Sequence, residues 1–124
     1  MTSNSIGRGA REAFEVVVAH VDTVPVVRVI GALDLGTAPI LDAKLEEFDS
    51  ITKPLVIDLS DVTFIDSSGI SVLIQCQERR EDDENGSRVR LVVTRDAVRR
   101  VIEFTGLTET FDVYASTSEA VLGG

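Results

Sequence analysis

The feature that most constrains the fold of this 124-residue chain is the alternation of short apolar runs with segments of helical periodicity. The apolar runs are rich in β-branched residues, which favours strands. The segments between them place apolar residues three and four positions apart, as one face of an amphipathic helix does. We therefore predict strands over residues 14–19, 26–30, 55–59, 90–93 and 111–114, and helices over residues 37–49, 68–80, 96–105 and 117–122.

This order of elements indicates the fold class. Strands that alternate with helices form a largely parallel sheet through right-handed crossovers. The first two strands follow each other without a helix, and the polar pair Asp22 and Thr23 precedes Pro25 between them, so they form a hairpin. We expect a single α/β domain over residues 13–122. Its sheet is mostly parallel, with four to five strands, an antiparallel N-terminal edge and about four flanking helices.

Turn and capping residues predict where the elements begin and end. Gly31 is expected to end the second strand, and Thr37 to cap the first helix before Pro39 in its first turn. Residues 60–69 are polar enough to predict a loop that leads into the second helix. Asp96 is expected to cap the third helix and Gly106 to end it. The acidic run 81–86 predicts a solvated turn.

Composition excludes several classes of function. Twenty-one acidic and 12 basic residues give a net charge of −9, whereas nucleic-acid binders concentrate Lys and Arg. The same negative charge opposes direct contact with anionic membranes. It either keeps the protein soluble or attracts a partner with a basic docking surface. Residues 1–12 are polar and lack the apolar stretch of a signal peptide, which predicts a disordered arm. The single cysteine, Cys76, allows no internal disulfide, and we expect a cytoplasmic protein.

The strongest local motif is Asp66-Ser67-Ser68-Gly69, between a buried strand and an amphipathic helix. The first N–H groups of a helix lack intrahelical partners, and the helix dipole places partial positive charge there. A phosphate on Ser67 is expected to be accommodated at such an end, so the surface charge changes while the fold persists. The alternative is that Ser67 or Ser68 only caps the helix and that Gly69 allows a tight turn.

Other polar residues are candidates for the same surface. Asp34 follows a strand whose carboxyl end lies where α/β sheets build sites, and Asp61 follows the next strand; each is equally compatible with a turn residue. Ser71 and Gln75 are i, i+4 neighbours one and two helical turns after Ser67, so these three side chains share one helical face.

Enzymatic and nucleotide-binding functions find little support. Residues 31–37 imitate a phosphate-binding loop but lack its lysine. The only histidine, His20, lies at the end of a hairpin strand, so no base is expected beside a serine nucleophile. Cys76 falls within a helix and is expected to be a buried, inert thiol. No cluster has the spacing of metal ligands, and we expect neither a cofactor nor catalysis.

Three segments resemble the STAS domain of bacterial anti-sigma factor antagonists. They are Gly31-Ala32-Leu33-Asp34, the run 56–62, and Phe64-Ile65-Asp66-Ser67-Ser68-Gly69-Ile70. The resemblance implies partner switching. The unphosphorylated antagonist binds an anti-sigma factor, itself a serine kinase that uses ATP, and so frees a sigma factor for transcription. Phosphorylation of the serine after the aspartate, here Ser67, with Ser68 as second choice, dissociates the complex, and a serine phosphatase restores binding.

The resemblance and the residues together give one contact surface and leave one alternative. The expected partner contacts are Asp34, Asp66, Ser67, Ser68, Gly69, Ser71 and Gln75. The family often has an acidic residue where this chain has Ala32. The alternative is a STAS-type regulatory subunit of a membrane transport or lipid-trafficking complex, which needs no phosphorylatable serine. The partner, the triggering signal and the oligomeric state are not encoded in any motif.

Overall fold

The computed structural model describes residues 13–51, 53–81 and 88–123, and within them it confirms the predicted order of elements. Two strands, β1 (Glu15–Val21) and β2 (Val24–Leu33), precede helix α1 (Ala38–Glu46). Strand β3 (Leu55–Ile65) leads into α2 (Ser67–Glu81), and β4 (Val89–Val92) leads into α3 (Asp96–Phe104). A short 3₁₀ turn, β5 (Asp112–Tyr114) and α4 (Thr117–Leu122) complete the domain. The arm expected over residues 1–12 and most of the acidic turn lie outside the described residues.

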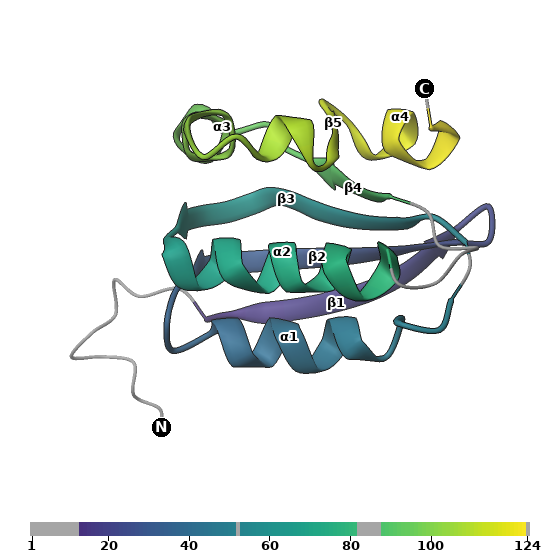
Figure 1. Ribbon diagram of the computed structural model, residues 1–124, viewed down its shortest axis with the longest axis horizontal. Helices are drawn as coiled ribbons and strands as arrows, with labels where there is room; N and C mark the ends of the chain where they lie inside the picture. The colour runs from purple at the N-terminus through teal and green to yellow at the C-terminus, as the bar shows by residue number, and fades with distance from the viewer. Residues whose placement is uncertain (1–12, 52, 82–87, 124) are drawn as a thin grey trace.

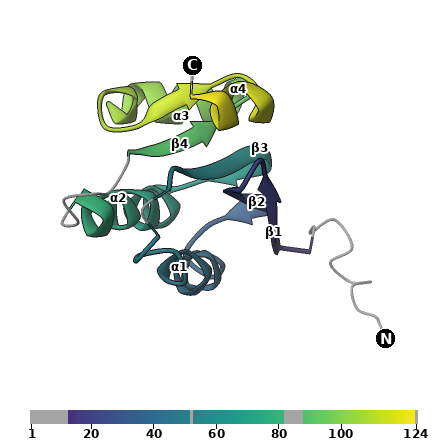
Figure 2. The same ribbon diagram turned by 90° about the vertical axis from the view of Figure 1, so that its right-hand side faces the viewer.

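The five strands form one sheet in the order β1-β2-β3-β4-β5. Strand β1 pairs antiparallel with β2 at one edge, and all other pairs are parallel, as the alternation predicted. Because the parallel strands follow one another without a change of direction, right-handed crossovers put α1, α2 and α3 on the same face. Helices α1 and α2 run side by side in Figure 1, and Figure 2 views both of them nearly end-on.

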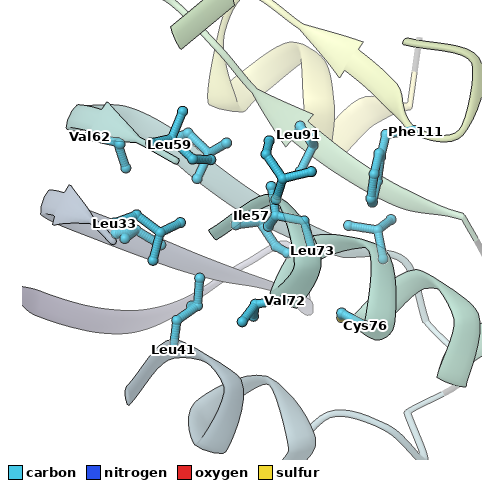
Figure 3. Packing of buried hydrophobic residues seen from close by; sticks show 14 of the residues in the cluster. Leu33, Leu41, Ile57, Leu59, Val62, Val72, Leu73, Cys76, Leu91 and Phe111 are labelled. Atoms are coloured by element: carbon cyan, nitrogen blue, oxygen red, sulfur yellow. The ribbon is translucent and has the colours of Figure 1, made fainter. Parts of the chain in front are cut away.

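Two apolar layers fix the helices to the sheet. The larger layer joins the three crossover helices to one face of the strands, and Figure 3 shows Leu41 and Leu73 directed at the strand residues Leu33 and Ile57. The smaller layer packs Ala120 and Val121 of α4 against the opposite face. Burial on both faces explains why the first half of β3 is almost wholly apolar.

The predicted loop over residues 60–69 is wrong, because β3 continues to Ile65. Only residues 55–58 of β3 pair with β4, while its pairing with β2 runs on to Ile65. The second half of the strand therefore borders solvent and tolerates Ser60, Asp61 and Thr63. Gly31 does not end β2 either: it lies inside the strand at φ +104°, where the register with β3 shifts by one residue.

The predicted helix caps are also partly wrong. Thr37 precedes α1, but its hydroxyl donates to the carbonyl of Ala32 and accepts from the N–H of Asp34 instead of capping the helix. Asp96 is the first residue of α3 and not its cap, and its carboxylate pairs with Arg99 at 2.8 Å. Gly106 follows α3 in the left-handed conformation at φ +76°, as a residue that ends a helix should.

Candidate functional site

The carboxyl ends of β2 and β3 bring the predicted site residues to one edge of the sheet. Leu33 and Ile65 are register partners, so Asp34 and Asp66 follow directly after paired positions on neighbouring strands. The N–H of Asp66 donates to the carbonyl of Leu33 at 3.2 Å, which ties the start of α2 to the end of β2. The two aspartates and the serines that follow Asp66 are therefore neighbours in space.

Asp66 caps helix α2. Its carboxylate oxygen Oδ1 accepts hydrogen bonds from the N–H groups of Ser68 at 2.8 Å and Gly69 at 3.3 Å. The alternative in which Ser67 or Ser68 caps the helix is therefore wrong, and so is the expectation that these N–H groups are open to a phosphate. Ser67 is exposed, and within the described part of the chain its hydroxyl makes no hydrogen bond. Ser68 is half-buried.

Gly69 allows α2 to approach the sheet closely. A methyl group at this position would lie 2.7 Å from Cγ of Leu33 and 3.0 Å from Cγ1 of Ile65, both buried side chains. Carbon atoms in good contact stay about 3.5–4.0 Å apart. Gly69 is itself buried, so its role is packing and it offers no surface to a partner.

Asp34 organises the connection between β2 and α1. Its Oδ1 atom accepts from the N–H of Gly36 at 3.0 Å and from the N–H and hydroxyl of Thr37, each at 3.1 Å. Its backbone carbonyl accepts from the N–H of Ala38 at 2.8 Å. Asp34 is thus a half-buried turn residue, and it directly follows Leu33, the register partner of Ile65.

The exposed side of α2 continues the edge. Ser67, Ser71 and Gln75 are all exposed and spaced four residues apart, whereas Val72, Leu73 and Cys76 face the core. Two exposed apolar side chains near the carboxyl ends of β2 and β3 were missed from the sequence. Leu35, in the connection after β2, is 77% exposed, and Phe64, near the end of β3, is 53% exposed. In the sequence, only their positions beside Asp34 and just before Asp66 could have identified them as candidates for a contact surface.

Other candidates lie elsewhere. Asp61 sits within β3 and pairs with Arg28 of β2 at 2.6 Å, a contact that raises the pKa of the Arg28 guanidinium. Cys76 is fully buried, and desolvation raises the pKa of its thiol to about 11, so it is protonated and shielded at neutral pH. Among the described residues, no three His, Cys, Asp or Glu side chains form a group that could hold a metal ion.

Two arginines hold the far end of α2. Arg79 pairs with Asp49 at 2.9 Å and with Asp42 at 3.5 Å, both near or on α1. Arg80 is 1% exposed and donates to the carbonyls of Phe48 and Lys53. Helix α2 is therefore anchored at both ends, by close packing at Gly69 and by these arginines.

Comparison with known proteins assigns the family. The STAS domain model matches residues 15–120. The chain belongs to the STAS domain family. It is 36% identical over 118 residues to the anti-sigma-F factor antagonist RsfB of Mycobacterium tuberculosis, covering 92% of each protein. It is 27% identical over 95 residues to the anti-sigma-B factor antagonist of Bacillus subtilis, covering 77% of this chain and 85% of that protein.

A solved structure agrees with this assignment. The crystal structure of an anti-sigma factor antagonist from Mycobacterium paratuberculosis matches with a TM-score of 0.81 at 32% identity, over 90% of this chain and 93% of that one. The chain is thus a STAS protein related to anti-sigma factor antagonists, which are regulators and not enzymes. None of the helices in the described ranges is long and apolar enough to cross a membrane.

Proposed function

We propose that this chain is an anti-sigma factor antagonist controlled by phosphorylation of Ser67. Its unphosphorylated form binds an anti-sigma factor in the cytoplasm, which releases a sigma factor for transcription. The anti-sigma factor is a serine kinase that phosphorylates Ser67 with ATP and thereby dissociates, and a serine phosphatase returns the antagonist to its binding form. The observation that carries the proposal is the Ser67 hydroxyl, which is exposed and has no structural task because Asp66 caps the helix.

The proposed contact surface surrounds that hydroxyl. It consists of the sheet edge and the exposed stripe of α2: Asp34, Leu35, Phe64, Asp66, Ser67, Ser68, Ser71 and Gln75. Leu35 and Phe64 supply apolar area that gains free energy when a partner covers it. The polar side chains of the surface are exposed or half-buried and set the register of the partner. A surface of mixed chemistry suits a partner that binds and dissociates repeatedly.

Phosphorylation acts on this surface through charge. A phosphate adds about −1.5 to −2 charges beside the Asp66 carboxylate, whose Oδ1 already holds the N–H groups of Ser68 and Gly69. Burying that phosphate under a partner without a matched cation costs several kcal/mol. A loss of about 3–4 kcal/mol corresponds to a several hundredfold weaker complex. This is enough to exchange one partner for another.

The anchors of α2 support a switch that leaves the fold unchanged. The helix start is held by Asp66 and by the Gly69 contact, and the helix end by Arg79 and Arg80. None of these contacts involves the Ser67 side chain. A charge added at Ser67 therefore alters the docking surface without removing a contact that the domain needs.

Calorimetric titration of the purified anti-sigma factor into three variants tests the proposal. We expect Ser67→Asp to weaken binding by at least tenfold, because aspartate carries only part of the phosphate charge. Ser67→Ala is expected to bind like the natural chain and to resist release by ATP. Ser118→Asp is the matched control: it adds the same charge to α4, away from the edge, and should leave affinity unchanged. Equal affinity of Ser67→Asp and the natural chain would contradict electrostatic release and favour a constitutive STAS subunit.

A further inference from the structure

A second surface feature lies at the opposite end of the sheet from Ser67. It is a pocket of about 290 Å³ between the β1–β2 hairpin and the segment that joins α1 to β3. Figure 1 shows these two connections close together, at the end of the molecule away from the start of α2. The pocket is lined by His20, Thr23, Pro25, Phe48, Ser50, Ile51 and Lys53. Its volume accommodates roughly ten water molecules, which is near the lower end for a small-molecule site.

The lining has an apolar floor and a rim of hydrogen-bond donors. Pro25 is buried and Phe48 and Ile51 are half-buried, whereas the four polar residues are exposed. Within the described residues, the side chains of His20, Thr23, Ser50 and Lys53 form no hydrogen bond or ion pair. Their donors are therefore available to a ligand.

The pocket is cationic in a strongly acidic protein. The chain carries a net charge of −9, yet the lining contains one lysine, one histidine and no carboxylate. The neighbouring carboxylate of Asp49 is held by Arg79 at 2.9 Å. A lysine with two hydroxyls and an imidazole offers more donors than the two oxygens of a carboxylate require. This set suits the three terminal oxygens of a phosphate monoester.

Both walls of the pocket are fixed in place. The buried Arg80 donates to the carbonyls of Phe48 and Lys53, so one guanidinium contacts two residues of the lining. On the other wall, Thr23 has φ +69°, a left-handed conformation that is unfavourable for a β-branched residue. Positive φ at both Asp22 and Thr23 is the geometry of the two-residue turn that joins the paired residues Val21 and Val24, and this turn sets the position of the wall. A site whose groups are already positioned loses less entropy when a ligand binds.

We propose that this pocket binds a small phosphate monoester. Lys53 and His20, with the hydroxyls of Thr23 and Ser50, contact the phosphate at the rim, and the organic group of the ligand lies on Phe48 and Ile51. The proposal is independent of the Ser67 switch, because no residue of the pocket belongs to the partner-contact surface.

Titration of the isotopically labelled full-length chain with phenyl phosphate, followed by amide chemical shifts in NMR spectra, tests the site. We expect saturable shifts at His20, Thr23, Ser50 and Lys53, with little change at Ser67 and Gly69. Inorganic phosphate lacks the apolar group and phenol lacks the anion, so each should bind at least tenfold more weakly. Lys53→Met keeps the aliphatic stem and should also lower affinity for phenyl phosphate at least tenfold. Lys44→Met removes a half-buried lysine outside the pocket, which pairs with Glu47 at 3.3 Å, and should not lower this affinity.

Three results would overturn the proposal. They are shifts centred away from the pocket, equal affinity for phenol and phenyl phosphate, and unchanged affinity in Lys53→Met. Lys53 is exposed and only its backbone carbonyl is used by Arg80, so the variant keeps the contact that shapes the pocket. A native spectrum of the free Lys53→Met protein makes its loss of affinity interpretable.

Discussion

Replacing Gly69 by alanine tests how α2 is seated on the sheet. At an ordinary helical position this change stabilises a protein by about 1 kcal/mol, because alanine favours the helix. Here the new methyl group would lie 2.7 Å from Cγ of Leu33, which is fully buried, and 3.0 Å from Cγ1 of Ile65. Overpacking of this kind costs about 1–3 kcal/mol. With contacts this short we take the upper value, and the net expected destabilisation is about 2 kcal/mol.

Urea unfolding followed by far-UV circular dichroism measures this change. In a thermal melt, the same loss of about 2 kcal/mol in the free energy of unfolding corresponds to a fall in Tm of roughly 8 °C for a domain of this size. Ser71→Ala is the matched control, since Ser71 is exposed on the same helix and its replacement should leave stability unchanged or slightly raised. The midpoint should shift without a change in the denaturant slope.

A double-mutant cycle identifies the cause. In a Leu33→Ala background the methyl group at residue 69 keeps only the 3.0 Å contact with Cγ1 of Ile65, so Gly69→Ala should destabilise the domain much less than it does in the natural chain. A Gly69→Ala protein as stable as the natural chain would refute the close-packing argument. An undiminished penalty in the Leu33→Ala background would show that the clash with Leu33 is not its source.

Two further predictions concern the hairpin and the buried thiol. Thr23→Gly should raise the free energy of unfolding by about 1 kcal/mol in urea titrations, because glycine accepts φ +69° without strain. A lower free energy of unfolding would show that the Thr23 side chain stabilises the turn. Cys76 should react with maleimide only after unfolding, and the free energy of unfolding should fall as pH rises from 9.0 to about 11. In that range the thiol loses its proton in the unfolded chain but keeps it in the folded one. Rapid maleimide labelling of the native protein would contradict the burial of Cys76.

The sequence was sufficient to predict the order of elements and the class of the sheet, because strand and helix periodicities differ clearly here. It was less informative where tertiary pairing decides the structure. Ser60, Asp61 and Thr63 resemble a loop, yet they continue β3 because β2 alone pairs with that half of the strand. Gly31 was expected to stop β2, but it adopts a left-handed conformation within the strand.

The structure brings most of the predicted site residues to one edge of the sheet, but it gives Asp66 a capping role that the sequence did not assign. Asp66, Ser67 and Ser68 are three consecutive residues that can each cap a helix, and spacing cannot choose among them. The hydrogen bonds from Ser68 and Gly69 identify Asp66 as the cap, which leaves Ser67 without a structural partner. Arg80 is a further example, since a buried arginine that binds two carbonyls follows from no pattern of apolar residues.

The central claim is that one phosphate on Ser67 releases the partner while the domain stays folded. The most direct measurement phosphorylates the full chain with its anti-sigma kinase and ATP, maps the phosphate by mass spectrometry, and titrates the isolated phosphoprotein against the same anti-sigma factor. We expect a single phosphate on Ser67, affinity reduced at least a hundredfold and a thermal unfolding curve little changed. A phosphate on another residue, or a Ser67-phosphorylated protein that binds as tightly as before, would contradict the account.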